Sequence, residues 1–545
     1  MVLEKIQKEN DIKKLTPEEL EQLKDEIRQF LIESISVTGG HLASNLGVVE
    51  LTMALHLCFD LPKDKIVWDV GHQSYTHKIL TGRKDGFSSL RQYGGMSGFP
   101  KAEESDCDCF NTGHSSTSIS AGLGLATARQ VTGDDYHVVS VIGDGALTGG
   151  MAYEALNNAS SVKGNFIIVL NDNNMSISEN VGGISQYLSG FRTADAYRDL
   201  KNNVMNSLNH IPIYGERMVK HIRNTKSSIK QLFIPGMFFE EMGIIYLGPV
   251  DGSDIKEMCR VFDEAKRVDG PVLVHVLTKK GAGYGPAERY PSRFHGAEPF
   301  VIETGLPKNK RTKANYTDVF STVMKKLGER NEKVVAITAA MADGTGLRRF
   351  HRNFPERFFD VGIAEAHATT FAAGLAKSGL IPVFAAYSSF LQRAFDQILH
   401  DVCIQNLHVI FAIDRAGLVG SDGETHQGIF DISYLSVIPN MTIMAPKNKW
   451  ELSDMMKFAV AYDGPIALRY PRGTAYDGLK EIRQPVELAK SELIKKGSRV
   501  AIMALGSMVK TAVDAVKLLE AEGISATLIN CLLYTSDAAD DLIGV

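Results

Sequence analysis

The stretch from Val138 to Ser178 contains two apolar runs, and each is followed at once by small or polar residues. Val138–Ile142 ends in Gly-Asp-Gly, and Phe166–Leu170 ends in Asn-Asp-Asn. An alanine-rich helical pattern, Gly150–Ala159, separates the two runs. Short apolar runs on either side of a helix are typical of parallel strands, whose carboxyl ends form the ligand-binding edge of an α/β sheet. The stretch therefore predicts an α/β fold with a candidate site where these two strands end.

The residues at the two strand ends suit a divalent cation and a phosphate group. Gly143 and Gly145 allow a tight turn and a close approach of the backbone to a ligand. Asp144 offers a carboxylate and Asn173 an amide oxygen. Mg²⁺ prefers such hard oxygen ligands and keeps coordination positions for phosphate oxygens and water. The alternative is an ordinary strand–helix turn capped by Asp144, and the second polar strand end favours the cation site.

Length and composition predict a globular protein of several domains. The chain has 545 residues, which indicates two to four domains, and 44% hydrophobic and 23% charged residues, as in globular proteins. The formal net charge of −5 provides no basic field for nucleic acid or an anionic membrane, so we expect neither as a partner. No cysteines form a CxxC pair, Cys107 and Cys109 have no second pair to complete a metal site, and the N-terminus is charged. We therefore expect reduced thiols and a cytoplasmic location.

The order of strand and helix patterns divides the chain into three α/β units. We expect a first domain over 1–305, a second over 315–480 and an incomplete third over 490–545. The first two should be doubly wound domains with mainly parallel sheets. Residues 286–312, rich in Pro, Gly and Lys, are interpreted as the linker between them.

Two segments do not follow this pattern. The stretch from about 182 to 240 is polar and weakly periodic, so we expect a mobile excursion from the first domain. The tail 532–545 continues no strand or helix pattern and is interpreted as an artefact of the sequence rather than part of the fold. The early end of the third unit should expose a sheet edge and part of its apolar core.

Local signals predict two helices in particular. Thr16 is the expected N-cap of the first long helix, with Pro17 at its first position and Glu19 completing a capping box. A second helix is expected over Ser389–Cys403, directly after the strand Ile381–Ala385.

Several polar residues lie where a cleft is expected, and each also has a plain structural explanation. His41 and His72 lie beside glycines, and His295 lies in an irregular segment. A hydrogen-bonded structural role explains each of them as well as catalysis does. The segment 110–124 places Gly, Ser and Thr at a helix start, which is a common way to hold phosphate and equally the mark of a well-capped helix.

Taken together, the motifs resemble the 1-deoxy-D-xylulose-5-phosphate synthase family from about Thr38 to about Asn530. The resemblance rests on the sequences HLASNLGVVELT, DVGHQSYTHKILTGR, TGHSSTSISAGLG, GDGALTGGM, NDNNMSIS, YSSFLQRAFDQ, DRAGLVGSDGETHQG and RYPRG. Transketolases and the oxoacid dehydrogenase E1 components share only the diphosphate signature and the glutamate with these motifs. The resemblance implies a homodimer whose chain carries a cofactor-binding domain, a pyrimidine-binding domain and a smaller C-terminal domain.

Thiamine diphosphate and Mg²⁺ are the cofactors that the resemblance implies. Asp144, Asn173 and the backbone carbonyl of Met175 would hold Mg²⁺ on the diphosphate. Glu365 would hydrogen-bond the aminopyrimidine ring and promote its imino tautomer. The remaining positions that match the cofactor site are His72, Gly113, His114, Ser115, Gly143, Gly145 and Ala146.

The implied reaction condenses pyruvate with D-glyceraldehyde 3-phosphate, giving 1-deoxy-D-xylulose 5-phosphate and CO₂. It is the first step of the non-mevalonate isoprenoid pathway and supplies precursor for thiamine and pyridoxal. The candidate substrate-binding residues are Tyr387, Arg393, Arg415 and Arg472. Arginine suits a phosphate because its planar fork pairs with two oxygens. The candidate catalytic residues beside Glu365 are His41, His295, Asp422 and His426, for proton transfer or for orienting substrate.

Two other functions remain open from the sequence. A transketolase-like ketol transfer would use the same cofactor without releasing CO₂ from pyruvate. An inactive fragment would bind cofactor and fail to turn over, because the third domain is incomplete.

Overall fold

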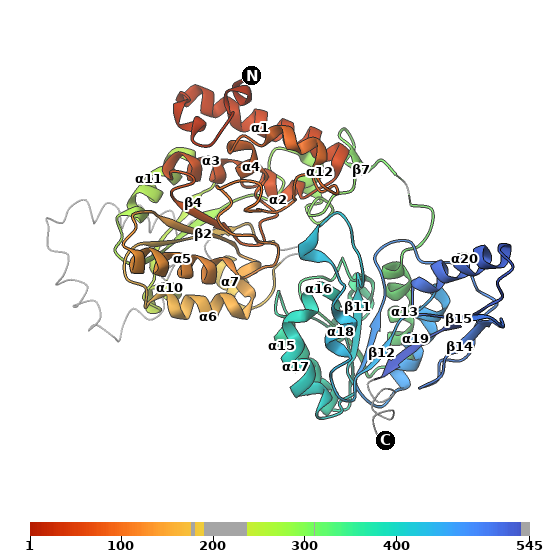
Figure 1. Cartoon of the computed structure of the whole chain (residues 1–545). Coiled ribbons are helices and arrows are strands. Elements are labelled where there is room, and N and C mark those ends of the chain that lie inside the picture. Colours follow the sequence, from red (N-terminus) through yellow and green to blue (C-terminus); the bar gives the residue numbers. More distant parts are fainter. Residues whose placement is uncertain (176–179, 190–236, 310, 536–545) are drawn as a thin grey trace.

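The computed structural model describes residues 1–175, 180–189, 237–309 and 311–535, which form α/β units in chain order (Figure 1). The excursion predicted over 182–240 lies mostly outside these residues. Its described edges form helices α7 (Gly183–Ser189) and α10 (Met237–Glu241).

The first unit is built on a sheet of five parallel strands in the order β1-β2-β3-β5-β4. The strands are β1 (Lys65–Trp68), β2 (Val138–Gly143), β3 (Phe166–Asp172), β4 (Ile245–Asp251) and β5 (Pro271–Leu277). Successive side chains of a strand face opposite sides of its sheet, and here both sides are buried. Val139 and Val141 belong to one core cluster, whereas Val138 and Ile142 belong to another. This two-sided burial confirms the predicted doubly wound sheet.

Helices cover both faces of the first sheet. Those that contribute to one core cluster are α1 (Pro17–Thr38), α2 (Leu42–Leu46), α3 (Val49–Cys58), α4 (Tyr75–Leu80) and α11 (Ile255–Lys266). Those that contribute to the other are α5 (Ser118–Thr132), α6 (Gly150–Ala159) and α10. The start of α1 is as predicted, because the Glu19 amide donates to the Thr16 hydroxyl and the Glu19 carboxylate accepts from the Thr16 amide.

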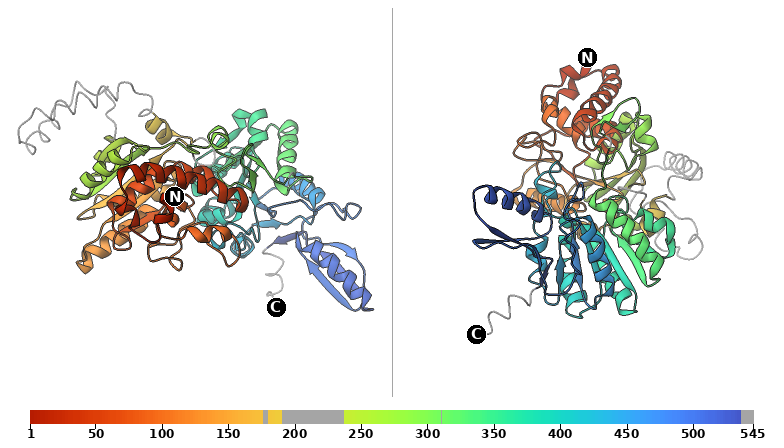
Figure 2. Two further views of the ribbon diagram at one scale, coloured as in Figure 1. Left: turned by 90° about the horizontal axis from the view of Figure 1, so that it is seen from above. Right: turned by 90° about the vertical axis from the view of Figure 1, so that its right-hand side faces the viewer.

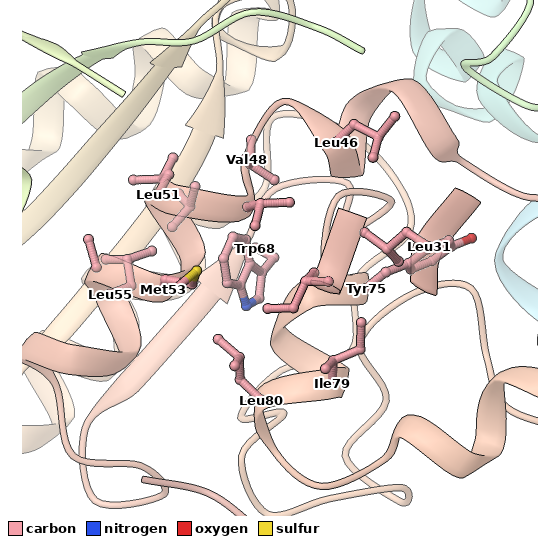
Figure 3. Packing of buried hydrophobic residues seen from close by; sticks show 14 of the residues in the cluster. Leu31, Leu46, Val48, Leu51, Met53, Leu55, Trp68, Tyr75, Ile79 and Leu80 are labelled. Carbon is pink, nitrogen blue, oxygen red and sulfur yellow. The ribbon is translucent and has the colours of Figure 1, made fainter. Parts of the chain in front are cut away.

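Trp68, at the end of β1, lies at the centre of the packing between α3, α4 and the strand (Figure 3). Leu51, Tyr75 and Ile79 belong to the same cluster, and all four side chains are fully buried or nearly so. Removing a buried tryptophan or phenylalanine ring typically costs about 3–5 kcal/mol. This packing therefore fixes the loop between β1 and α4, which carries His72.

The second unit contains a sheet of seven strands in the order β17-β12-β13-β11-β10-β8-β9. The strands are β8 (Val334–Thr338), β9 (Phe358–Asp360), β10 (Ile381–Tyr387), β11 (Ile410–Asp414), β12 (Thr442–Met444), β13 (Ile466–Arg469) and β17 (Leu533–Thr535). All are parallel to their neighbours except β17. The helices of this unit are α13 (Tyr316–Arg330), α14 (Arg348–Asn353), α15 (Glu365–Lys377), α18 (Asp431–Leu435) and α19 (Lys449–Ala461). They too cover both faces of the sheet, since its alternate residues fall into two core clusters.

The helix predicted over Ser389–Cys403 is present, but its helix type changes along its length, so that it consists of four short successive pieces. They are α16 (Ser388–Leu391), a 3₁₀ turn (Gln392–Ala394), α17 (Phe395–Gln397) and a π-helical turn (Ile398–Cys403). Such changes of helix type within one segment often accompany a side chain that is directed to a functional site. The 3₁₀ turn here contains Arg393, whose side chain reaches across to the first unit.

The third unit lies beside the second sheet and away from the first (Figures 1 and 2). Its sheet has the order β14-β16-β15, and α20 (Met508–Ala521) packs on it. The strands are β14 (Glu492–Lys495), β15 (Val500–Ala504) and β16 (Ala526–Asn530).

The tail 532–545 was predicted to continue no pattern, and this is wrong for its first residues. Leu533–Thr535 forms β17, which pairs antiparallel with β12 at the edge of the second sheet. An edge strand offers unpaired backbone groups to any extended segment, whatever its side-chain pattern, so the pattern carried no signal. Residues 536–545 lie outside the described part of the chain.

The predicted linker 286–312 is largely folded onto the first unit. It contains most of α12 (Gly285–Arg289) and a hairpin of β6 (Phe300–Val301) with β7 (Leu306–Pro307). The rings of Phe294 and Phe300 are buried, with centroids 5.2 Å apart. These aromatic anchors outweigh the Pro, Gly and Lys content, so the connection between the units begins only after Pro307.

Candidate active site

One pocket lies between the first and second units and encloses about 1040 Å³ of space, part of it open to solvent. The carboxyl ends of β1, β2 and β3 form one wall, and the start of α15 lies on the opposite side. The predicted site residues that line it are His41, His72, Gly113, Ser115, Gly143, Asp144, Gly145, Ala146, Asn173, Met175, His295, Glu365, Arg393 and His426. Residues predicted from separate motifs are thus brought to one place.

Oxygen atoms gather where β2 and β3 end. The amide of Asp144 donates to the carbonyl of Asn171 at 3.1 Å, which holds the Gly-Asp-Gly turn against the next strand. The Asn173 side-chain oxygen accepts from the Met175 amide at 3.0 Å, which fixes the turn after β3. Within the described residues no group of three His, Cys, Asp or Glu side chains is suited to hold a metal. A cation at this edge would therefore depend on one carboxylate, an amide oxygen, a backbone carbonyl and oxygens of a ligand.

The turn from Gly113 to Ser115 precedes α5 and is held by a buried carboxylate. Asp69 Oδ1 accepts from the amide of Ser116 at 2.7 Å, and Oδ2 accepts from the amide of Ser118 at 3.0 Å. Burial raises the pKa of Asp69, and these hydrogen bonds oppose the increase. The helix start is therefore capped, and the side chain of Ser115 is left at the rim of the pocket.

Glu365 is the first residue of α15, and only 3% of its surface is exposed. Burial raises the pKa of its carboxyl group, and the positive charge of Arg393 partly opposes this. Arg393 itself donates to the hydroxyl of Ser115 at 3.0 Å and to the Ser115 carbonyl. The Ile363 amide donates to the hydroxyl of Thr148 at 3.0 Å. These contacts join the two walls of the pocket next to Glu365.

Three predicted histidines form a cluster on the side of the first unit. The ring centroids lie 5.5 Å apart for His41 and His72, 5.0 Å for His72 and His295, and 6.1 Å for His41 and His295. Burial lowers the pKa of all three, that of His72 to about 3, so the rings are neutral near pH 7. Nζ of Lys280 lies 3.4 Å from Nδ1 of His295, and burial lowers the pKa of Lys280 to about 8.

Asp422 lies close to two arginines and to one histidine of the cluster. Arg91 forms an ion pair with Oδ1, Nε2 of His41 lies 3.7 Å from the same oxygen, and Nη1 of Arg472 lies 3.5 Å from Oδ2. Burial alone would raise the pKa of Asp422, but the positive charge of Arg91 holds it well below its usual range. Asp422 therefore remains ionised and links the histidine cluster to the arginines.

Tyr387 and Arg415 form a second group next to the pocket. The Arg415 guanidinium lies 3.6 Å from the centroid of the buried Tyr387 ring. Arg415 has a φ of +61°, in the left-handed region that non-glycine residues seldom adopt, and such strain is common at functional sites. Burial raises the pKa of Tyr387. The positive charge of Arg472 opposes this increase, and the negative charge of Asp422 adds to it.

His426 is enclosed by rings. The Phe99 ring stacks on it with centroids 5.0 Å apart and an angle of 14°, and the Phe390 ring meets it edge-on. Burial lowers the pKa of His426 to about 4. Nδ1 of His426 lies 2.8 Å from the Thr425 hydroxyl, and Nε2 of His114 lies 2.6 Å from the Thr425 carbonyl. His114 thus supports the His426 loop and is absent from the pocket lining.

Sequence reasoning missed several residues of this site. Lys280 is the third residue after β5 ends, so the rule that polar residues at strand ends form sites could have found it. Tyr75, whose hydroxyl lies 3.1 Å from Nδ1 of His41, belongs to one of the motifs of the family resemblance but was not singled out. Arg91 and Phe99 lie in a stretch whose function no local signal reveals. Their roles depend on contacts with residues up to 331 positions away.

Models of known protein families match three successive parts of the chain. Residues 3–278 match the model described as 1-deoxy-D-xylulose-5-phosphate synthase. Residues 312–476 match the transketolase pyrimidine-binding domain, and residues 489–536 match the transketolase C-terminal domain. The chain belongs to the 1-deoxy-D-xylulose-5-phosphate synthase family.

Relatives in the synthase family are similar over nearly the whole chain. The 1-deoxy-D-xylulose-5-phosphate synthase of Lachnoclostridium phytofermentans is 58% identical over 97% of this chain and 85% of its own length. That of Natranaerobius thermophilus is 56% identical over 97% of this chain and 84% of its own length. Among solved structures, a Campylobacter jejuni transketolase is 18% identical over 95% of this chain and 89% of its own, with a TM-score of 0.39.

Proposed function

We propose that this chain condenses pyruvate with D-glyceraldehyde 3-phosphate to give 1-deoxy-D-xylulose 5-phosphate and CO₂. The observation that carries the proposal is one pocket with oxygen donors at the ends of β2 and β3 and the buried Glu365 on its opposite side. Membership of the synthase family supports this reaction over a transketolase-like ketol transfer.

Thiamine diphosphate and Mg²⁺ are the proposed cofactors, and the donor set fits both. Asp144, Asn173 and the Met175 carbonyl supply the hard oxygens that Mg²⁺ prefers. His72 and the Gly113–Ser115 turn lie on the same wall and would contact the diphosphate. When bound, the cofactor supplies a carbon nucleophile and an electron sink for decarboxylation.

Glu365 would act on the pyrimidine side. A buried carboxyl group with a raised pKa is well suited to share a proton with a ring nitrogen. Nδ1 of each of the neutral rings of His41, His295 and His426 already contacts a protein group, so the other ring nitrogen would face substrate oxygens near the reacting carbon atoms.

Arg415 and Arg472, with Tyr387, are the proposed anchor for the phosphate of the acceptor aldehyde. Asp422, beside Arg472, is already paired with Arg91, so Arg415 and Arg472 leave net positive charge for a phosphate dianion. Arg393 was predicted to bind substrate, and we propose instead that its main task is to hold Ser115.

We further propose a cytoplasmic homodimer with domains over 1–305, 315–480 and 490–545. Within the described ranges, no helix combines the length and apolar character needed to cross a bilayer.

The proposal is tested by incubating the protein with thiamine diphosphate, Mg²⁺ and labelled pyruvate, with and without D-glyceraldehyde 3-phosphate. We expect CO₂ release matched by formation of the sugar phosphate. Sugar products from a ketose donor without CO₂ would favour ketol transfer, and cofactor binding without any product would favour an inactive fragment.

A variant tests the assignment of Glu365. Glu365→Ala should abolish product formation and leave binding of the diphosphate cofactor largely intact, as measured by calorimetry. Undiminished turnover in this variant would contradict the assigned role.

A further inference from the structure

A group of buried charges lies in the first unit, apart from the pocket lining. It joins α4, and Arg83 three residues after that helix, to a segment that begins at Ser97. The members are His77, Lys78, Arg83, Glu104 and Asp108, and the side chains of His77, Lys78 and Asp108 have no exposed surface. The mechanism proposed above uses none of them, although His77, Lys78 and Arg83 belong to one of the motifs of the family resemblance.

The two carboxylates of this group hold the turn that carries Phe99. Oε1 of Glu104 accepts from the amide of Ser97 at 2.6 Å. Oδ2 of Asp108 accepts from the amide of Lys101 at 2.8 Å. These two amides lie two residues before and two residues after Phe99. The backbone of the turn is therefore fixed on both sides of the ring.

Lys78 and Arg83, from the α4 segment, form ion pairs with these two carboxylates. Nζ of Lys78 lies 2.5 Å from Oε2 of Glu104. Arg83 donates to both oxygens of Asp108, at 2.7 and 2.8 Å. The two negative charges of the carboxylates balance the two positive charges of Lys78 and Arg83. A buried charge that loses its partner strongly destabilises the fold. Neither carboxylate is therefore free to leave its cation, and the turn is fixed to α4.

His77 completes the support of Asp108 in a defined tautomer. Nε2 of His77 lies 2.9 Å from Oδ1 of Asp108, an ionised carboxylate that only accepts, so this nitrogen carries the proton. Burial lowers the pKa of His77, which leaves its Nδ1 as an acceptor for Nε2–H of His56 at 2.9 Å.

The turn that carries Phe99 reaches from this group of charges to the pocket. The Phe99 ring is only 3% exposed, stacks on His426, and lies 5.5 Å from the ring of His41. The amide of Arg91, the partner of Asp422, donates to the Met96 carbonyl at 2.8 Å, just before the same turn. A shift of the turn would therefore uncover His426.

We propose that Glu104 and Asp108 are positioning residues for the reaction. They fix the Phe99 turn, and the Phe99 ring then shields His426 from water and fixes its orientation. The proposal rests on the proposed function, in which His426 lies beside the substrate. A purely structural pair would stabilise the first unit without any specific effect on His426.

Two paired variants separate these roles. Lys78→Met with Glu104→Met removes both charges together, so Arg83 loses only its 3.6 Å contact with Glu104 and keeps its pair with Asp108, but the Ser97 amide is left without an acceptor. Lys78→Met with Glu104→Gln removes the same charges and keeps an oxygen for that amide. We expect kcat/KM for D-glyceraldehyde 3-phosphate to fall about tenfold in the first variant and to recover within about threefold of wild type in the second. Equal losses in the two variants would overturn the proposal.

Phe99→Leu provides the coupling test. If Glu104 acts through the Phe99 ring, adding Phe99→Leu to the K78M/E104M variant should lower kcat/KM by less than about twofold more. Fully additive losses would mean that Glu104 acts by another route. The acidic limb of the pH profile of kcat/KM should also shift to higher pH in K78M/E104M. Water that reaches His426 removes the burial that lowers the pKa of this histidine.

Carbethoxylation by diethyl pyrocarbonate tests the same idea without any turnover. Mass spectrometry should show His426 modified several-fold faster in K78M/E104M and in Phe99→Leu than in wild type or K78M/E104Q. An unchanged rate in K78M/E104M would contradict the proposal even if the wild-type protein made no product. Absence of product with the expected labelling would contradict only the proposed function.

Discussion

Arg393 of the second unit donates a hydrogen bond of 3.0 Å to the hydroxyl of Ser115 in the first unit. A second guanidinium nitrogen donates to the carbonyl of the same residue. Two donors on one rigid fork fix both the position and the orientation of the turn before α5. Since Glu365 lies near the same guanidinium, one side chain relates the two walls of the pocket.

Replacing Arg393 with lysine should weaken binding of thiamine diphosphate about tenfold. A lysine keeps the charge but places a single ammonium group where a planar fork reaches two oxygens. Calorimetric titration in the presence of Mg²⁺ measures the affinity. Ser115→Ala, which removes only the hydroxyl acceptor, should have a smaller effect, and equal affinities for wild type and Arg393→Lys would refute the argument.

Arg415→Ala should raise KM for D-glyceraldehyde 3-phosphate about a hundredfold and change KM for pyruvate less than threefold. The reason is that only the aldehyde substrate carries a phosphate, and hydrogen bonds to charged groups contribute about 1.5–3 kcal/mol each. Initial rates with each substrate varied in turn give both constants. Arg348→Ala, on the surface of the second unit, controls for the loss of one positive charge. A similar rise in both KM values would remove the phosphate-anchor role.

Asp414→Asn should be more stable than wild type, and the difference in the free energy of unfolding should grow as pH rises. Burial raises the pKa of Asp414 to about 6 in the folded state, from its ordinary value of 3.8. The folded state therefore holds the proton more tightly, and stability is lost as pH rises between about 4 and 6. Two pKa units correspond to about 3 kcal/mol. The Thr317 hydroxyl, 2.7 Å from Oδ2, has an oxygen to donate to in either form.

Urea unfolding of wild type and Asp414→Asn at pH 4.5 and 7.5 measures this difference. The advantage of the variant should be larger at pH 7.5. Asp463→Asn, at an exposed position, controls for the removal of one carboxylate. A constant difference across this range would show that Asp414 does not titrate there.

Lys447→Met should destabilise the contact between the second and third units by about 3–5 kcal/mol. Nζ of Lys447 lies 2.6 Å from Glu451 and 2.5 Å from Glu492, and all three side chains are buried. Removing the lysine leaves two carboxylates in the core without a cation. Urea unfolding should show the loss, and Lys457→Met on the exposed face of α19 should not. A stability equal to wild type would mean that water reaches the carboxylates.

Some features of the fold were readable from the sequence because they depend on neighbouring residues. The capping box at Thr16 and Glu19 predicted the start of α1, and the apolar run before Gly143 predicted β2. The polar residues after β2 and β3 lie at the pocket, as expected from the rule that parallel strands present their carboxyl ends to ligands.

Other features depend on contacts between distant segments, and no local pattern carries them. Asp422 could be singled out from its motif, but its partner Arg91 follows an irregular turn and is paired with it only by the docking of the two units. The change of helix type at Arg393 accompanies the contact of this side chain with Ser115 in the other unit, which no local pattern of the helix reports.

Both walls of the pocket belong to a single polypeptide, and only a short connection after Pro307 separates them. That connection acts as a tether, which turns the meeting of the walls into an intramolecular event with a high effective concentration. Doubling the length of a flexible tether costs only about 0.6 kcal/mol of closure entropy. The alignment of the walls is therefore set by contacts such as Arg393 with Ser115, while the tether sets how often the walls meet.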